Sequence, residues 1–311
     1  MCMNIKNVTV LGSGLMGNGL ALVFAKDPET HVILRSRSMK SEPLAGIRSN
    51  LDMLIEKGAM TEEEAGGILS RILFTTDMER ALKDADLVIE CVLENMELKQ
   101  NLFAEIEPLC KESCILATNT SVMSITEIAA KVKNKSRFVG AHFWNPPYLI
   151  PLVEVVKGED TSDETMDITY EYLKKIGKKP VKCVKDVPGF IANRLQHAIW
   201  REALSIVENG IADPATVDEA LRYGPGLRWP ILGILENADM IGLDLSLSIQ
   251  SYIVKYLEDA HEPSKLLREL VEKGELGFKT GKGYQTWTPE QIAASNKRLR
   301  EYLIEVTKDL K

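Results

Sequence analysis

The sequence predicts an α/β protein in which a mostly parallel sheet flanked by helices is followed by an all-helical C-terminal domain. Short β-branched apolar runs alternate with helical stretches through the first half. The pattern becomes helical from about residue 187 to the end. A chain of 311 residues is long enough for two domains. We therefore expect a sheet domain over residues 1–186 and a helical substrate and dimerisation domain over residues 187–311.

Six runs in the first half are candidate strands. They are nearly continuous in apolar residues, as strands buried on both faces should be; the runs are Val8–Leu11, His31–Leu34, Ile72–Thr75, Leu87–Val92, Ile115–Thr118 and Phe138–Ala141. The charged stretch 41–71 between the second and third runs predicts a helical hairpin. Gly58 would end its first arm, and Thr61 with Glu64 forms a capping box that would begin the second.

The helical half has clear start signals. A turn at Pro188-Gly189 marks the change of pattern, and Phe190–Glu208 predicts a long apolar helix. Asp213-Pro214 and Thr288-Pro289 each combine an N-cap acceptor with a proline at the first helical position. The second of these signals begins a final charged helix that we expect to reach Lys311.

Composition excludes several classes of function. A net charge of −7 argues against nucleic-acid binding, and no run approaches the roughly 20 apolar residues that span a membrane. The first nine residues do not form a secretion signal, so we expect a cytoplasmic protein. The cysteines are odd in number and lack metal-ligand spacing, which predicts free thiols and no metal site; they are Cys2, Cys91, Cys110, Cys114 and Cys183.

A glycine motif follows the first predicted strand and opens a helix. Gly12 permits a tight turn, Gly14 lets the backbone approach a pyrophosphate, and Gly17 lets the helix pack closely on the strand. The helix N-terminus, with Leu15 and Met16, would present free N–H groups to that anion. In this context the motif predicts a Rossmann-type domain that binds a nicotinamide dinucleotide.

The sequence leaves the choice between NAD and NADP open. A strand that binds NAD ordinarily ends in a carboxylate that bonds the ribose hydroxyls, whereas this one runs into Arg35-Ser36-Arg37-Ser38. The hydroxyl of Ser36 and the guanidinium of Arg37 suit the 2′-phosphate of NADP. The alternative is that the arginines are merely solvated and that NAD is held by backbone contacts.

His142 and Glu154 are the candidate catalytic pair. His142 comes at the end of the sixth predicted strand, and the carboxyl ends of parallel strands face the cofactor crevice. Glu154 lies in the apolar run Leu152–Val156, where a carboxylate is costly to bury without a partner. An imidazole is such a partner, and its ordinary pKa suits proton exchange near neutral pH. A purely structural salt bridge is the alternative.

Five motifs in register resemble the L-3-hydroxyacyl-CoA dehydrogenase family. Together with the glycine motif they span most of the chain, from Gly12 to Tyr284; they are Asn119-Thr120-Ser121, His142-Phe143-Trp144-Asn145-Pro146, Leu152–Val156, Pro188–Arg194 and Gly277–Tyr284. The resemblance implies that His142 is the general base for the hydroxyl proton and that Glu154 orients it. It implies further that Ser121 and Asn193 bond the reacting oxygen or the histidine and that Asn145 supports the substrate loop.

The resemblance also implies cofactor contacts and a quaternary structure. Glu94 and Lys99 would lie near the nicotinamide ribose, and Asn119 would contact the cofactor. The cofactor that the family ordinarily uses is NAD. Members of the family usually dimerise through their helical domains, so we expect a homodimer with a small-molecule substrate.

Two substrate classes remain open, and we favour a 3-hydroxyacyl-CoA. The segment Glu236–Asp244 looks like the acyl-CoA enzymes, and cations on the predicted hairpin could bind the phosphates of coenzyme A; these are Arg48, Lys57 and Arg71. The stretch Gly224–Pro230 is instead similar to relatives that act on free hydroxy acids, the L-gulonate and carnitine dehydrogenases. Arg228 within it could bind a carboxylate, although an interdomain salt bridge is the alternative.

A third possibility is a protein without catalytic function. The lambda-crystallins of this group are structural proteins, and such a protein could still bind a dinucleotide. The set of Ser121, His142, Glu154 and Asn193 is complete here, which favours an enzyme.

Overall fold

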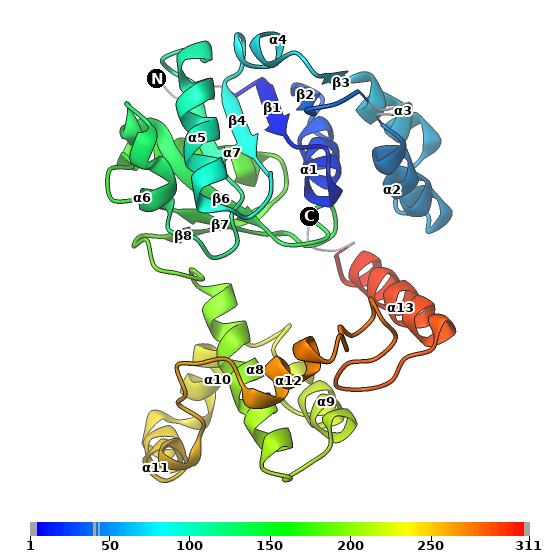
Figure 1. Ribbon diagram of the computed structural model, residues 1–311, viewed down its shortest axis with the longest axis vertical. Coiled ribbons are helices and arrows are strands. Elements are labelled where there is room, and N and C mark those ends of the chain that lie inside the picture. Colours follow the sequence, from blue (N-terminus) through cyan, green and yellow to red (C-terminus); the bar gives the residue numbers. More distant parts are fainter. Residues whose placement is uncertain (1–4, 40–41, 43, 308–311) are drawn as a thin grey trace. The chain divides into compact units, whose positions relative to one another are not determined.

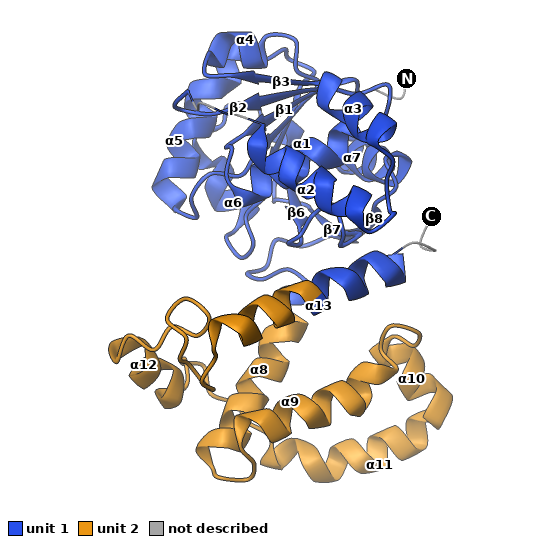
Figure 2. Ribbon diagram, turned by 90° about the vertical axis from the view of Figure 1, so that its right-hand side faces the viewer, with its two compact units in different colours: residues 1–193, 298–311 blue, residues 194–297 orange. Residues whose placement is uncertain are grey.

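The computed structural model describes residues 5–39, 42 and 44–307. The chain forms two compact units (Figure 2), one of residues 1–193 with 298–311 and one of residues 194–297. The expected domains, 1–186 and 187–311, differ from these units chiefly at the C-terminus. Residues 298–311 group with the sheet unit because Ile304 of the last helix packs on Leu54 and Leu149.

The first unit is built on one eight-stranded sheet with the order β3-β2-β1-β4-β5-β6-β7-β8. The six strands from β3 to β6 are mutually parallel, β7 pairs antiparallel with β6, and β8 is parallel to β7. The strands are β1 (Asn7–Leu11), β2 (His31–Arg35), β3 (Ile72–Thr75), β4 (Leu87–Glu90), β5 (Ile115–Thr118), β6 (Phe138–Phe143), β7 (Leu152–Val156) and β8 (Lys179–Cys183).

All six predicted strands are confirmed, and two more complete the sheet. The apolar run Leu152–Val156 is itself a strand, β7. Strand β8 reads Lys-Pro-Val-Lys-Cys, and its two lysines and proline conceal it in the sequence. A proline is tolerated there because β8 lies at the edge of the sheet.

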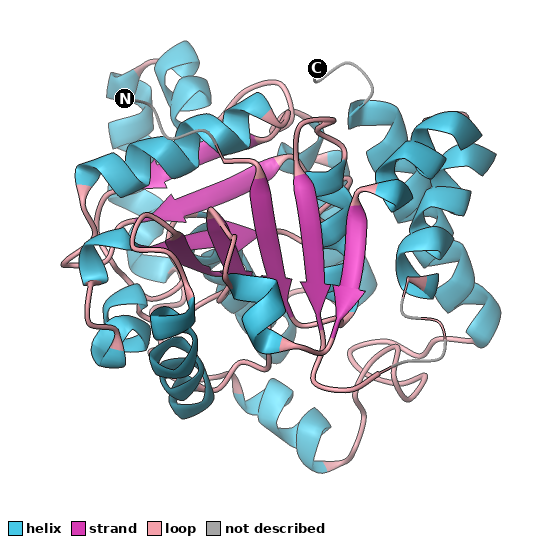
Figure 3. Ribbon diagram, turned by 90° about the horizontal axis from the view of Figure 1, so that it is seen from above, coloured by secondary structure: helices cyan, strands magenta, loops and turns pink. Residues whose placement is uncertain are grey.

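Helices cover both faces of the sheet (Figure 3). Phe24 of α1 and Tyr172 of α7 belong to one apolar cluster, and Phe103 of α5 belongs to another with Phe138 of the sheet. The predicted hairpin is present as α2 and α3, with the Thr61–Glu64 capping box formed. The helices are α1 (Leu15–Ala25), α2 (Ala45–Glu56), α3 (Glu62–Ser70), α4 (Met78–Leu82), α5 (Met96–Ile106), η1 (Glu107–Leu109), α6 (Ile125–Ile128), η2 (Ala129–Lys131), η3 (Lys135–Arg137) and α7 (Asp163–Lys175).

The remainder of the chain is helical, as predicted (Figure 1). Asp213 caps α9, and Thr288 accepts a hydrogen bond from the Gln291 amide in the first turn of α13. The predicted end at Lys311 lies outside the described residues. The helices are α8 (Ala192–Glu208), α9 (Pro214–Tyr223), η4 (Pro225–Leu227), α10 (Ile234–Ile241), α11 (Leu243–Ile253), η5 (Val254–Tyr256), α12 (Lys265–Glu272) and α13 (Pro289–Thr307).

Candidate active site

The glycine turn after β1 has the shape of a phosphate site. Gly12 has φ 113°, and a Cβ on Gly17 would lie 1.7 Å from the Gly12 carbonyl oxygen, so neither position accepts a side chain. A Cβ on Gly14 would meet nothing within 4 Å, which leaves open space beside the start of α1. The first turn of α1 has no side-chain cap and no acidic residue. Its N–H groups therefore suit a dinucleotide pyrophosphate.

The end of β2 brings the cationic segment beside this turn. The Gly12 amide donates to the Arg35 carbonyl over 2.9 Å. Ser36 is buried, whereas Arg37 is exposed. Among the described residues, the buried Nε of Arg35 has no hydrogen-bond partner. A buried donor of this kind is costly unless a ligand satisfies it, and an anion would do so.

Strand pairing places the predicted catalytic pair together. The antiparallel register of β6 and β7 sets His142 directly opposite Glu154. The Nδ1 atom of His142 lies 2.8 Å from Oε2 of Glu154, and both residues are buried, at 4% and 0% exposed. A carboxylate only accepts hydrogen bonds, so Nδ1 carries the proton and Nε2 is left as the basic nitrogen.

Further donors hold Glu154 in its ionised form. The backbone N–H groups of Ile191 and Ala192 each donate to Oε1 over 2.9 Å, and the Trp144 indole donates to Oε2 over 3.4 Å. Burial alone raises the pKa of Glu154, but the hydrogen bonds from His142, Ala192 and Ile191 outweigh it and bring the pKa below its usual range. Glu154 therefore stays charged beside His142.

Two aromatic rings flank the histidine. The ring centroids of Trp144 and Phe190 lie 5.5 and 5.8 Å from that of His142. Phe190 has φ 51°, a left-handed conformation that is strained for a bulky residue. Its ring is buried, and its amide bonds the Val187 carbonyl over 3.0 Å. The sequence predicts the turn at Pro188-Gly189 but not this contact, because the contact depends on a backbone angle that residue type does not determine.

A polar cluster joins the end of β5 to the same strand. Oδ1 of Asn119 accepts from the Phe143 amide over 2.8 Å, next to His142. Nδ2 of Asn193 donates to the Ser121 carbonyl over 2.9 Å. The structure thus brings four of the predicted site residues onto neighbouring segments; they are Asn119, Ser121, His142 and Asn193. Ser121 is exposed and Asn193 is buried.

The buried Lys99 is linked to this polar cluster through Glu94. Nζ of Lys99 lies 2.7 Å from Oε1 of Glu90 and 3.1 Å from Oε2 of Glu94, and Lys99 is 1% exposed. Glu94 in turn accepts from the Thr120 hydroxyl and, over 2.9 Å, from the Ser121 amide. Glu90 was not among the site residues predicted from the sequence. The sequence does contain a signal for Glu90, because a buried acidic residue inside the apolar run of β4 requires a cationic partner.

Two predicted substrate residues, Asn145 and Arg228, take no part in the contacts described above. Asn145 follows β6 and is exposed. Arg228 is exposed after η4 of the second unit, and within the described part of that unit its guanidinium forms no ion pair. Of the five cysteines, Cys2 lies outside the described residues and the other four are free thiols.

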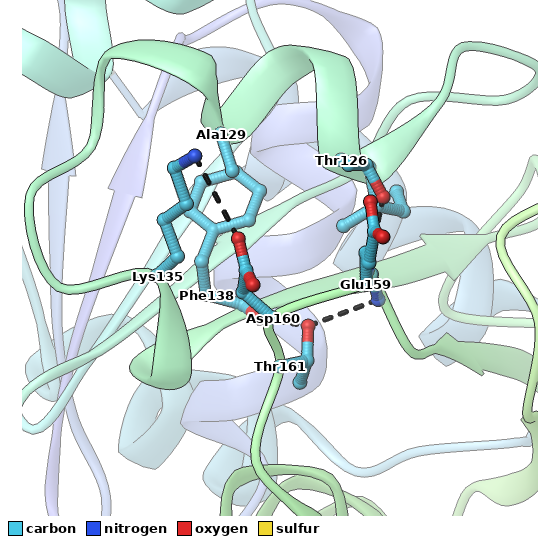
Figure 4. A pocket seen from close by; sticks show the side chains of 9 residues that line it. Thr126, Ala129, Lys135, Phe138, Glu159, Asp160 and Thr161 are labelled. Carbon is cyan, nitrogen blue, oxygen red and sulfur yellow. Dashed lines mark hydrogen bonds and ion pairs between the residues drawn. The ribbon is translucent and has the colours of Figure 1, made fainter.

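The first unit also has a small cavity away from this site. A cavity of about 10 Å³ between α6 and the start of β6 contains the Lys135–Asp160 ion pair (Figure 4). This volume has room for at most about one water molecule, which is too small for a substrate. In the part of the chain that the structure describes, no group of three His, Cys, Asp or Glu residues could hold a metal ion, and no helix could cross a membrane.

A parallel sheet with a phosphate-binding glycine turn, beside a buried His–Glu pair, defines a Rossmann-type dehydrogenase. Comparisons with known proteins give the family. The family model described as the 3-hydroxyacyl-CoA dehydrogenase NAD binding domain matches residues 7–187, and that of the C-terminal domain matches residues 189–287. The chain belongs to the 3-hydroxyacyl-CoA dehydrogenase family, as its motifs predicted, and is a nicotinamide-dependent oxidoreductase.

Three relatives illustrate the range of the family. A probable 3-hydroxybutyryl-CoA dehydrogenase from Deinococcus radiodurans is 39% identical over 277 residues, which are 88% of this chain and 98% of that protein. The crystal structure of (S)-3-hydroxybutyryl-CoA dehydrogenase from Ralstonia eutropha matches with TM-score 0.77 and 36% identity, covering 92% of this chain and 100% of that one. The structure of 5-formyl-3-hydroxy-2-methylpyridine 4-carboxylic acid 5-dehydrogenase, an NAD⁺-dependent dismutase, matches with TM-score 0.89 and 32% identity, covering 99% of both chains.

Proposed function

We propose that the protein interconverts a 3-hydroxyacyl-CoA and a 3-oxoacyl-CoA, with His142 as general acid and base and Glu154 as its partner. The observation that carries the proposal is the buried contact of 2.8 Å between the two side chains. The family supports the reaction type, and the hydroxybutyryl-CoA relatives support the thioester.

His142 moves the proton in this mechanism. The nicotinamide, when bound, exchanges hydride with C3 of the substrate. In oxidation the Nε2 atom of His142 takes the hydroxyl proton, and in reduction it returns the proton to the 3-oxo oxygen. Glu154 stabilises the imidazolium that forms in between. The rings of Trp144 and Phe190 exclude water from the buried side of the pair.

Ser121 and Asn193 position the reacting oxygen. The exposed Ser121 hydroxyl is available to the substrate, while Asn193 fixes the Ser121 backbone through its carbonyl. Asn145, on the loop after β6, supports the substrate from the same end of the sheet.

The cofactor is held by the glycine turn and by the ends of β4 and β5. Gly12, Gly14, Leu15, Met16 and Gly17 provide the pyrophosphate site. Glu94 and Asn119 follow the carboxyl ends of β4 and β5, where the nicotinamide ribose belongs, and Lys99 of α5 reaches Glu94 over 3.1 Å. Ser36 and Arg37, with the unpartnered Nε of Arg35, favour NADP over the NAD that the family ordinarily uses.

A free hydroxy acid is the second candidate substrate. In its favour, the pyridine-carboxylic acid dehydrogenase structure covers 99% of this chain with the higher TM-score, 0.89 against 0.77. Arg228 would then bind the carboxylate of a gulonate- or carnitine-type substrate, and its exposed guanidinium, without an ion-pair partner in the described part of its own unit, is available for that role.

One assay decides among these functions. NADH and NADPH oxidation is followed with acetoacetyl-CoA and with free acetoacetate, and L-gulonate oxidation is followed alongside. Turnover of the thioester supports the main proposal. Turnover of free acids alone, abolished in Arg228→Ala, supports the second. No turnover of any substrate by a chain that binds NADH would favour a crystallin-like structural protein instead.

We also propose a homodimer formed through the helical unit. Helices α9, α10, α11 and α12, all of whose residues the structure describes, contain no buried residue. Large apolar side chains are exposed on them, such as Leu235 and Leu247. An apolar surface of this kind is covered by a partner in a stable protein, and a second copy satisfies it symmetrically.

A further inference from the structure

Lys178 is fixed between the end of α7 and the start of β8. Gly177, with φ 81°, follows the helix in the left-handed conformation, and the Lys178 amide donates to the Leu173 carbonyl over 3.0 Å, as in a Schellman motif. The amide of Lys179 donates to the Pro151 carbonyl over 2.9 Å, just before β7 begins. The backbone of Lys178 is thus held on both sides, and only 7% of the residue is exposed.

The ammonium group of Lys178 bonds two carbonyl groups of the β6–β7 loop, residues 144–151. Its Nζ atom donates to the carbonyl oxygen of Pro147 and, over 2.9 Å, to that of Ile150. It also lies 5.8 Å from the centre of the ring of Phe143, the last residue of β6. One buried side chain therefore connects this loop to the strand that carries the proposed general base.

The bonded part of the loop is a compact turn. The Pro146 carbonyl accepts from the Leu149 amide over 3.0 Å and from the Ile150 amide over 2.9 Å. Asn145 directly precedes this turn and is exposed. Trp144 comes before it, with its ring and indole N–H against the His–Glu pair. A shift of the turn would therefore move the two loop residues that adjoin the candidate site.

The ammonium group is an expensive way to fill this position. Both of its acceptors are neutral carbonyls, and burial, with a smaller contribution from the charge of Lys26, lowers the pKa of Lys178 to about 7. A methionine side chain has a similar length and would fill the space without desolvating a charge. What the ammonium adds to packing is a pair of hydrogen bonds to the loop.

We propose that Lys178 is a positioning residue, which holds the β6–β7 loop where Asn145 meets the acyl substrate. The proposal rests on the proposed function, in which Asn145 supports the substrate. Loss of the two hydrogen bonds would free the turn and weaken substrate binding. The pairing of His142 with Glu154 would be kept, because the register of β6 and β7 sets it. The expected signature is a rise in KM with little change in kcat.

A double-mutant cycle with Asn145 tests this route. We expect Lys178→Met to raise the KM for acetoacetyl-CoA by about tenfold and to change kcat by less than about threefold. In the Asn145→Ala background the same change should raise KM by less than about twofold, because the substrate contact that the loop places is already lost. Lys182→Met, at an exposed lysine of β8, is the matched control and should alter neither constant. Effects that multiply in the double variant, or an unchanged KM in Lys178→Met, would overturn the proposal.

Lys178→Gln provides a second variant in case the methionine variant does not fold. Its amide keeps N–H donors but is one bond shorter, so we expect it to hold at most one of the two carbonyls. The KM should rise by about three- to tenfold and should again be nearly unaffected in the Asn145→Ala background. A rise that persists in full in that background would overturn the proposal.

The fluorescence of Trp144 tests the loop without turnover. Its signal is the difference between spectra recorded with and without Trp144→Phe, in the wild type and in the Lys178 variant. We expect the emission to shift to longer wavelength in the variant, because the indole leaves the His–Glu pair for water. An identical Trp144 emission in both would overturn the proposal. No turnover of acetoacetyl-CoA by the wild type would instead refute the proposed function, and the fluorescence would still judge the role of Lys178.

Discussion

His142 and Glu154 face each other across an antiparallel strand pair, with 2.8 Å between Nδ1 and Oε2. The strand register sets the two residues opposite each other, so their contact does not depend on the placement of a flexible loop. Glu154 is held further by two backbone N–H groups at the start of α8. In the proposed mechanism this arrangement prepares the pair for proton exchange before substrate binds.

Glu154→Gln tests the role of the carboxylate. The variant keeps the shape but cannot stabilise imidazolium, so we expect kcat to fall by about 10²- to 10³-fold. The lowered pKa of Glu154 means that its charged form stabilises the fold above the unfolded value near 4.3 and that this stabilisation is lost as pH falls through the folded pKa. The difference in unfolding free energy between wild type and variant should therefore shrink below about pH 4. A difference independent of pH would argue against an ionised Glu154.

Asn193→Ala tests the positioning of Ser121. Loss of the amide leaves the Ser121 carbonyl without its donor, so we expect kcat to fall by about 10- to 100-fold while NADH affinity is kept. Asn209→Ala removes an exposed amide just after the same helix and should change neither quantity. Equal losses in the two variants would indicate a general effect on α8.

The segment after β2 tests cofactor preference. We expect wild type to use NADPH at least as efficiently as NADH, and Arg37→Ala to lower kcat/KM for NADPH alone by about tenfold. Ser36→Asp should reverse the preference, because a carboxylate repels the 2′-phosphate and accepts from ribose hydroxyls. Steady-state kinetics with both nucleotides measures this. A large advantage for NADH in the wild type would show that the arginines are merely solvated.

Lys178 makes stability depend on pH. Burial, with a smaller contribution from the charge of Lys26, lowers the pKa of Lys178 to about 7. Its Nζ donates to the carbonyls of Pro147 and, over 2.9 Å, of Ile150. The unfolded chain binds this proton more tightly, so the contribution of Lys178 to stability rises from about pH 7 to about pH 10 and is constant below.

Lys178→Met removes that dependence. Unfolding free energies are measured with denaturant at pH 7, 8 and 9. The unfolding free energy of the wild type, relative to that of the variant, should rise by at most about 1.4 kcal/mol for each pH unit. Lys182→Met, at an exposed lysine in the adjoining strand β8, is the control. Parallel profiles for wild type and Lys178→Met would show that Lys178 is charged throughout.

The molar mass of the protein in solution tests the proposed dimer. We expect light scattering to give twice the mass of one chain, and Leu235→Lys with Leu247→Lys to shift the protein toward monomer. Met39→Lys, a similar exposed change in the sheet unit, should leave the mass unchanged. A wild type that is monomeric at micromolar concentration would contradict the proposal.

The sequence predicted the parts of the fold that depend on local chemistry. Apolar strands buried on both faces, the Thr61–Glu64 capping box and the Asp213 cap all have signals within a few residues. Strand β8 was not predicted, because its lysines and proline are typical of the edge of a sheet and not of a strand buried on both faces. The return of α13 to the first unit was not predictable, since it depends on Ile304 meeting residues some 150 and 250 positions earlier in the chain.

The site was predicted in part for the same reason. His142 and Glu154 could be paired because a carboxylate in an apolar run requires a partner, and the strand register confirms their contact. Glu90 carries the same signal and was missed, although it holds Lys99 in place. The left-handed backbone of Phe190 and the unpartnered Nε of Arg35 have no signature in residue type, so only the structure could reveal them.

The most direct test of the central claim is single-turnover oxidation of NADH by His142→Gln with saturating acetoacetyl-CoA, beside NADH binding by fluorescence. We predict that the rate of the chemical step falls by at least about 10³-fold while the dissociation constant for NADH changes by less than about twofold. A His142→Gln variant that transfers hydride at a rate within about tenfold of wild type would contradict the account, because another group would then move the proton.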